Sequence, residues 1–77
     1  MEISVKCYLD DQGEETPTAF FMGDRRIEVV EVLDRWLAPD HRYFKVEGDD
    51  GALYILRHEV VSDKWVLTLF KQQGRKT

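Results

Sequence analysis

The sequence has few of the residues from which catalytic and metal sites are usually built. Among its 77 residues there is one cysteine, which excludes an internal disulfide, and there are two histidines. A Gly-rich phosphate loop is absent from the sequence, as is any Ser/His/Asp or Cys/His arrangement of the kind used for nucleophilic catalysis. We therefore predict a protein that is not an enzyme and that has no catalytic residue, no metal ligand and no cofactor.

Long apolar segments are missing as well. No run approaches the ~20 apolar residues that a membrane-spanning helix needs, and the N-terminal MEISVKCYLDD lacks the basic flank and apolar stretch of a signal peptide. Hydrophobic residues make up 43% of the chain and charged residues 34%, as in soluble globular proteins. We expect a cytoplasmic location, no membrane contact, and a single small domain over residues 1–77 that is a monomer or a weak homodimer.

The net charge of −4 is located near the N-terminus. Residues 1–15 contain five acidic residues and one lysine, and residues 16–77 are neutral in sum. From Gly51 onward there are five basic and two acidic residues, which permits a weak phosphate contact but is far from the basic stripe of a dedicated nucleic-acid binder. We expect an acidic loop at about residues 10–17 and a flexible basic tail at about residues 72–77.

The segment ISVKCYL alternates between apolar and polar residues, which predicts a strand at about residues 3–9. Ile3, Val5, Cys7 and Leu9 would share one face of this strand. A thiol on such a face lies in the core, so Cys7 is predicted to be buried and slow to react. A second strand is expected at about residues 18–22, after the acidic loop.

A two-residue turn follows this second strand and predicts a hairpin. The turn consists of Gly23 and Asp24. Counting outward from it pairs Met22 with Arg25, Phe20 with Ile27 and Thr18 with Val29.

Residues 27–37 are compatible with either a helix or a strand. Apolar residues recur at helical spacing at Val29, Val32, Leu33, Trp36 and Leu37. However, β-branched residues are concentrated at the start of the segment, and a tight hairpin leads directly into it, which favours a strand. Two adjacent valines at 29 and 30 interrupt the alternation, so the strand is predicted to contain a β-bulge there.

The segment LDRWLAPDHRYFKV, residues 33–46, gathers aromatic, basic, acidic and histidine side chains. Pro39 and Asp40 suit the second and third positions of a type I turn, which places Asp40 and His41 at the tip of a hairpin. A general base needs a pocket and an orienting partner, and a metal ion needs three or four converging ligands. We therefore interpret the segment as a turn across which Trp36 meets Tyr43, and not as a site.

The segment RYFKVEGDDGALYILRHE allows two hairpin registers. A two-residue loop would place apolar residues opposite charged ones. A three-residue loop at residues 49–51, with a left-handed glycine at its end, instead pairs Phe44 with Leu56 and Val46 with Tyr54. This second register is favoured because it brings these four residues together on one face of the hairpin, which then forms part of the core.

The opposite face of this hairpin is half apolar and half basic. It carries Tyr43, Lys45, Leu53, Ile55 and Arg57, with Tyr43 facing Arg57 within cation–π reach. The last strand, KWVLTLFK, also has apolar residues on both faces. Antiparallel strands with two apolar faces curl into a barrel or present a surface to a partner. We predict an all-β fold, an antiparallel meander of five to six strands curled toward a small SH3-like barrel.

A pattern of aromatic, glycine and valine residues extends over most of the chain. It consists of Phe20, Gly23, Val29, Trp36, Tyr43, Val46, Gly51, Tyr54, Trp65 and Leu67. In this pattern the chain resembles a family of small bacterial proteins of unknown function, which are similar to the C-terminal region of some error-prone-polymerase-like proteins in DNA damage tolerance. The resemblance implies a strand at residues 27–36 and brings no established activity. The short LAPDH connection departs from the longer loop of that family.

Two functions remain open from the sequence. The favoured one is a non-catalytic binding module for a protein partner, and the alternative is an accessory nucleic-acid-binding domain linked to DNA repair or damage tolerance. In both cases aromatic residues interleaved with basic ones would form the contact surface. The predicted binding residues are Tyr43, Lys45, Ile55, Arg57 and Trp65.

Overall fold

The computed structural model describes residues 1–72, which form six strands joined by turns and contain no helix. The strands are β1 (Glu2–Leu9), β2 (Glu15–Met22), β3 (Arg25–Leu37), β4 (His41–Gly48), β5 (Ala52–Glu59) and β6 (Lys64–Gln72). Nothing in residues 1–72 therefore qualifies as a helix that could cross a membrane.

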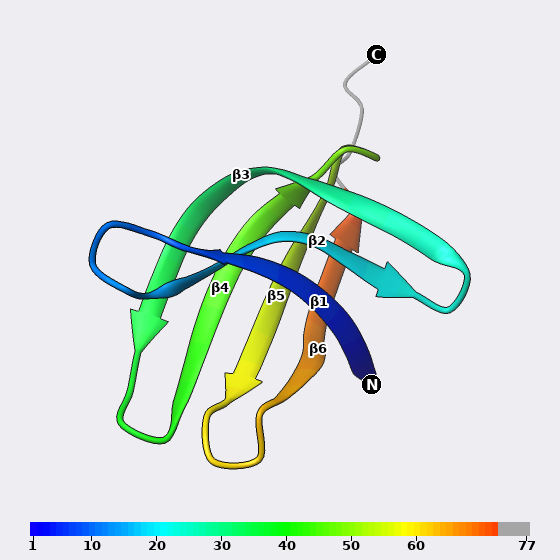
Figure 1. Cartoon of the computed structure of the whole chain (residues 1–77). Coiled ribbons are helices and arrows are strands. Elements are labelled where there is room, and N and C mark those ends of the chain that lie inside the picture. The colour runs from blue at the N-terminus through cyan, green and yellow to red at the C-terminus, as the bar shows by residue number, and fades with distance from the viewer. Residues whose placement is uncertain (73–77) are drawn as a thin grey trace.

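Every strand pairs antiparallel with the next one in the sequence, and β6 returns to β1, so that the sheet closes into a small barrel (Figure 1). This arrangement confirms the predicted all-β meander and its curling into a barrel. The closure between β1 and β6 is short, because within the described strands only Glu2 and Ile3 pair with β6, opposite Val66 and Trp65.

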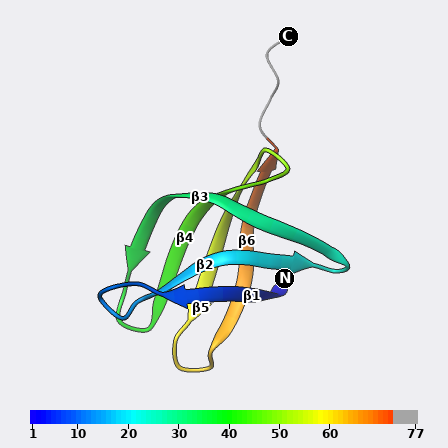
Figure 2. The same cartoon turned by 45° about the horizontal axis from the view of Figure 1, so that its top comes forward.

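The long strand β3 takes part in both halves of the barrel. Its first residues, 25–28, pair with β2, and residues 29–37 pair with β4. The register with β4 shifts after Val29 and again after Val32, and such bulges bend a strand. As a result, β1, β2 and the first part of β3 cross over the sheet formed by β4, β5 and β6 (Figures 1 and 2). The predicted strand and the bulge next to Val29 are confirmed, and the bulges explain why the apolar spacing resembles that of a helix.

The core fills the space between these two layers. Its fully buried side chains include Phe20, Ile27, Phe44, Val46, Tyr54 and Leu56. Gly48 lies beneath them without room for a side chain, because a Cβ there would come within 2.7 Å of Ile27 Cγ2 and 2.9 Å of Tyr54 Cε1. Glycine at this position therefore lets β4 approach the core closely.

The β4–β5 hairpin adopts the register predicted from its three-residue loop. Phe44 pairs with Leu56 and Val46 with Tyr54, and Gly51 has the left-handed φ of 84° that the bulged turn requires. All four paired side chains are buried, as expected. The sequence pattern thus identified both the register and the inward face of this hairpin.

The β3–β4 connection is the tight turn predicted from Pro39 and Asp40. The Ala38 N–H donates to the His41 carbonyl at 2.9 Å, and the Asp40 carboxylate lies 2.8 Å from His41 Nδ1. Trp36 pairs with Tyr43 across the two strands. The segment that gathers so many reactive side chains is thus a hairpin end.

The N-terminal part of the barrel differs in several details from the sequence-based prediction. The predicted pairs Met22–Arg25 and Phe20–Ile27 form, but the ladder between β2 and β3 ends at Ala19 and does not include a Thr18–Val29 pair. Strand β2 begins at Glu15, inside the expected acidic loop. Its Pro17, opposite Cys7, adjoins a register shift at which Thr18 of β2 has no paired residue on β1, and a missing N–H is tolerated at such a bulge.

The loop between β1 and β2 is organised by a single carboxylate. Asp10 Oδ1 accepts hydrogen bonds from the N–H groups of Gln12 and Glu14, both at 2.9 Å. Leu9, predicted to face the core, is exposed because β1 ends there and runs into this loop. At the other end of the chain, Gln72 completes β6, and the rest of the predicted basic tail, residues 73–77, lies outside the described residues.

Candidate functional site

The outward surface of β3, β4, β5 and β6 carries most of the residues predicted to bind a partner. We call this surface the outer face. It consists of Glu31, Asp34, Trp36, Tyr43, Lys45, Glu47, Leu53, Ile55, Arg57, Val66, Leu69 and Lys71. The strand registers arrange these residues in three rows that cross the sheet.

The first row of the outer face is aromatic and cationic. Trp36, Tyr43 and Arg57 occupy neighbouring positions on β3, β4 and β5. The rings of Trp36 and Tyr43 meet edge to face at 6.4 Å, and the Arg57 guanidinium lies 6.0 Å from the Tyr43 ring centroid. The contact predicted between Tyr43 and Arg57 is confirmed. Arg57 is also 3.2 Å from Glu59 Oε2, which partly neutralises its charge.

The middle of the outer face is an apolar hollow with a basic rim. Leu53, Ile55 and Leu69 line a depression of about 240 Å³, and Lys45 and Lys71 stand beside it. Within residues 1–72, neither lysine takes part in an ion pair. This hollow could accept an apolar side chain while the two ammonium groups attract negative charge.

Trp65, predicted to share a surface with the other binding residues, does not lie on the outer face. It is 7% exposed and faces the core, where its ring stacks on that of His58 at 4.4 Å. The β5–β6 register shifts between Ile55 and Leu56. Trp65 and Leu67 therefore face inward, whereas Leu69, which has the same parity but follows the shift, faces outward. Trp36, which is 47% exposed, is the tryptophan of the outer face. The predicted contact between Trp36 and Tyr43 was the sequence feature that could have placed Trp36 on this surface.

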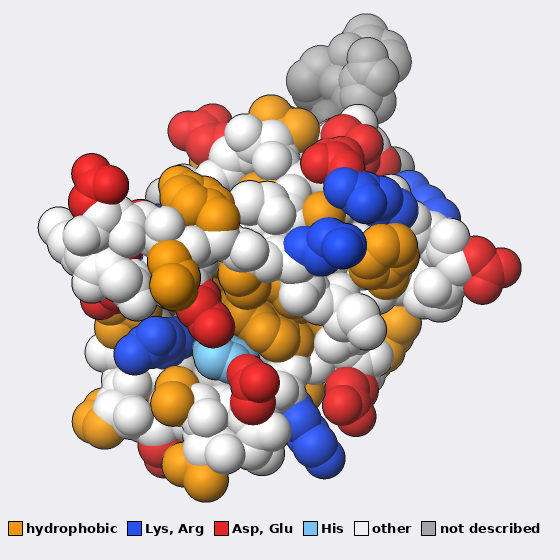
Figure 3. All heavy atoms as spheres, in the orientation of Figure 1, with side chains coloured by type: hydrophobic (Ala, Val, Ile, Leu, Met, Phe, Trp, Pro, Cys, Tyr) orange, Lys and Arg blue, Asp and Glu red, His pale blue; other side chains and the backbone are white. Residues whose placement is uncertain are grey.

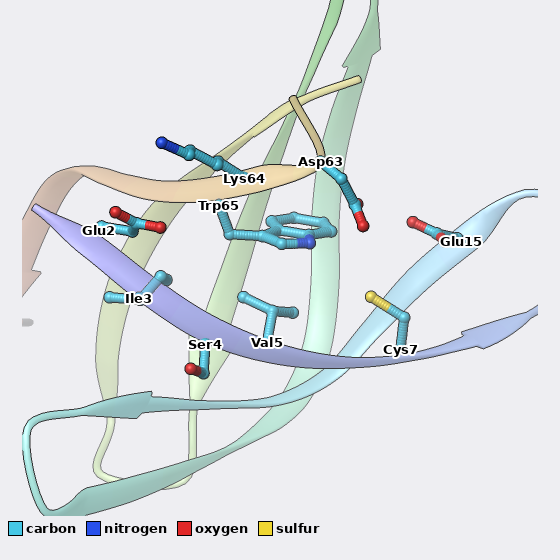
Figure 4. Close-up of a pocket in the computed structure, with 9 residues that line it drawn as sticks. All are labelled: Glu2, Ile3, Ser4, Val5, Cys7, Glu15, Asp63, Lys64 and Trp65. Atoms are coloured by element: carbon cyan, nitrogen blue, oxygen red, sulfur yellow. The ribbon is translucent and has the colours of Figure 1, made fainter. Parts of the chain in front are cut away.

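A second candidate site, not predicted from the sequence, lies where β1 separates from β6. The cavity there has a volume of about 410 Å³ and is lined by residues of β1, β2, β6 and the preceding turn (Figure 4). Among its residues are Cys7, Glu15, Asp63 and Trp65. We call it the seam cavity.

A histidine and two carboxylates meet beside the seam cavity. His58 Nε2 lies 3.0 Å from Asp63 Oδ1, and His58 Nδ1 lies 3.9 Å from Glu15 Oε1. The three residues come from β5, from the β5–β6 turn and from the start of β2, so only the closed barrel brings them together. The sequence offered one signal, since His58 has the same inward parity as Tyr54 and Leu56.

Cys7 adjoins this group from β1. Its sulfur points toward Glu15 and Asp63 (Figure 4). Burial raises the pKa of the Cys7 thiol to about 11, and the negative charges of Glu15 and Asp63 add to the effect. The predicted core position is therefore only partly right, because Cys7 packs against the core but is partly exposed at the cavity.

The charge distribution in the space-filling view is mixed. Acidic and basic side chains are interspersed with apolar ones, and a histidine lies beside acidic side chains (Figure 3). Comparison of the chain with models of known protein families, with curated proteins and with solved structures gives no match.

Proposed function

We propose that the protein is a non-catalytic binding module whose outer face binds a protein partner. The observation that carries this proposal is the apolar hollow of Leu53, Ile55 and Leu69 with Lys45 and Lys71 at its rim. A partner that fits it presents a large apolar side chain flanked by carboxylates. Burying the apolar side chain would supply affinity, and the two lysines would fix its orientation.

The charges of the outer face favour a protein over nucleic acid as the partner. Glu31, Asp34 and Glu47 lie on the same surface as the lysines. Their carboxylates would repel the continuous row of negative charges of a phosphate backbone, whereas a peptide can place one or two carboxylates at the lysines alone. Tyr43 with Arg57 offers a place for one base to stack, which together with the family resemblance supports nucleic-acid binding as the alternative.

A display library of random peptides tests the proposal even though the partner is unidentified. We expect selection on the protein to enrich peptides in which an aromatic or aliphatic residue is flanked by Asp or Glu. Leu69→Ala and Tyr43→Ala should each weaken a selected peptide by about tenfold or more, as for the central residues of an interface. Val61→Ala, which truncates an exposed valine in the β5–β6 turn, should leave the affinity unchanged.

The same variants distinguish the two kinds of partner. For a single-stranded oligothymidylate, log affinity should fall with log salt by about one unit per phosphate contact, and Lys45→Ala combined with Lys71→Ala should reduce that slope. Strong oligonucleotide binding with such a slope, and no peptide enrichment, would replace the protein partner with nucleic acid. Peptides that bind the folded Leu69→Ala and Tyr43→Ala variants as tightly as wild type would show that the outer face is not the site.

A further inference from the structure

The wall of the barrel has a gap between β1 and β6. Beyond Ile3, β1 pairs with β2 alone, so the seam cavity opens between β1 and the start of β6. Glu15 points into this region from β2 and Asp63 from the β5–β6 turn (Figure 4). Among residues 1–72, no strand pairing joins β2 to the β5–β6 hairpin, so any link between them must come from side chains or from a bound group.

Ligand atoms of three residues converge at the edge of this gap. One atom each from Glu15, His58 and Asp63 lie within 4.8 Å of one another. Within residues 1–72, neither carboxylate forms an ion pair with a lysine or an arginine. Two negative groups therefore face one largely buried imidazole without another cation from this part of the chain to neutralise them.

The His58 ring carries an unpartnered nitrogen in the described part of the chain. An ionised carboxylate can only accept a hydrogen bond. With Asp63 ionised, His58 Nε2 therefore carries a proton and donates it in the hydrogen bond to Asp63 Oδ1. Nδ1 is buried, has no hydrogen-bond partner among residues 1–72, and faces Glu15 Oε1 at 3.9 Å, which is too long for a hydrogen bond. His58 is only 5% exposed. In a neutral ring, the Nδ1 lone pair buried opposite a carboxylate is unfavourable unless a positive charge, either a proton or a metal ion, lies between them.

We infer that this group binds a divalent transition-metal ion, coordinated by His58 Nδ1 and the Glu15 carboxylate and oriented by Asp63. Asp63 would hold the imidazole through Nε2, as outer carboxylates do for metal-bound histidines. An imidazole ligand favours Zn²⁺ and its neighbours over Mg²⁺ or Ca²⁺. Glu15 and Asp63 line the seam cavity, and the Cys7 sulfur points toward the same two carboxylates (Figure 4). The ion would fasten β2 to the β5–β6 hairpin across the gap.

Calorimetric titration of the full chain with ZnCl₂ tests this site. We expect one ion per chain, a higher Tm with Zn²⁺ than without it, and no such effect from the same concentration of MgCl₂. Glu15→Gln should abolish binding, and Asp63→Asn should weaken it by about 10-fold to 100-fold. Asparagine suits the left-handed φ of 56° at position 63, so this variant should keep its fold.

Two control variants remove similar groups that lie outside the proposed ligand set. Glu2→Gln neutralises another carboxylate at the same cavity, and His41→Asn removes the other histidine. Both should bind Zn²⁺ like wild type. Equal Zn²⁺ affinity for wild type, Glu15→Gln and Asp63→Asn would overturn the inference, and so would binding that is lost in His41→Asn. Cys7→Ser should also bind Zn²⁺, because the proposed ligands are His58 and Glu15. Loss of Zn²⁺ binding in Cys7→Ser, with binding kept in Glu15→Gln, would show that the thiol holds the ion and would overturn the inference.

Trp65 provides an optical readout that locates the ion. Its ring stacks on His58 at 4.4 Å, so Co²⁺ on Nδ1 should quench its fluorescence. In a Trp36→Phe background, which leaves Trp65 as the single tryptophan, we expect saturable quenching that Zn²⁺ reverses by competition. The quenching should disappear in Glu15→Gln and persist in Glu2→Gln. Zn²⁺ binding that leaves Trp65 fluorescence unaffected by Co²⁺ would place the metal elsewhere and overturn the inference.

Discussion

At the scale of single residues, Cys7 shows how position on a strand controls reactivity. Burial, with a contribution from the nearby acidic side chains, raises the pKa of its thiol from 9.0 to about 11. At neutral pH the native thiolate population should therefore be about 100-fold below that of the unfolded chain. We expect a thiol reagent to modify Cys7 slowly in native protein and rapidly in urea. If Cys7 reacts in native protein as fast as in urea, its thiol is not buried in the folded chain.

The two tryptophans mark how far residue positions can be read from the sequence. Trp36 could be placed correctly, because a turn of known length fixes which residue faces Tyr43. Trp65 could not, because β6 has apolar residues on both parities and the register shift near Leu56 is not encoded by a turn residue. The group around His58 was missed for a different reason. Its members are far apart in the sequence and meet only in the closed barrel.

At the scale of elements, the β4–β5 hairpin depends on the carboxylate of Asp50. This carboxylate accepts hydrogen bonds from the Tyr54 hydroxyl, from the Ala52 N–H at 3.1 Å and from Arg25 at 3.0 Å. Desolvation alone would raise the pKa of Asp50, but these donors together lower it below the ordinary 3.8. Asp50→Asn should therefore reduce the free energy of unfolding by about 1–2 kcal/mol at pH 7, since a charged acceptor is lost.

The pH dependence of this effect has a definite sign. Well above pH 3.8 the Asp50 carboxylate is ionised in both the folded and the unfolded chain, so its stabilising effect is fully present. As the pH falls below that value, the unfolded chain takes up the proton first, and the benefit is lost as the pH passes through the folded pKa. Urea unfolding of wild type and Asp50→Asn at several pH values should give curves that converge on acidification. A constant difference would exclude the carboxylate as the cause.

The elements that could be predicted are those whose ends are defined by turn chemistry. Three turns each fixed a connection and, through it, the pairing of the strands on either side. They contain Gly23 with Asp24, Pro39 with Asp40, and Gly51. The start of β2 could not be fixed in this way, because Glu15 and its acidic neighbours have low strand propensity and are held by pairing with β1. Where no strong turn residue marks the end of a strand, the strand boundary is therefore set by pairing with its neighbours in the folded barrel.

At the scale of the whole molecule, barrel closure depends on very few residues. Among residues 1–72, only two pairs join β1 to β6, while each of the other neighbouring strands shares a longer ladder. The sequence predicted curling toward a barrel from strands with two apolar faces, but the position of this short closure depends on bulges that the sequence does not mark. The seam cavity is a consequence of that short closure, so no sequence pattern could reveal it.

Two leucine-sized residues at opposite ends of β1 test whether this closure stabilises the fold. Ile3 pairs with Trp65 across the seam and is 7% exposed, whereas Leu9 at the end of the same strand is 66% exposed. Ile3→Ala should lower the free energy of unfolding by about 2–4 kcal/mol, because it removes buried methyl groups and leaves a cavity in the core. Leu9→Ala should change it by less than about 0.5 kcal/mol. Both values follow from urea unfolding at one pH. If the two substitutions cost the same, β1 does not contribute its inward face to the core, and the barrel is not closed by this strand in solution.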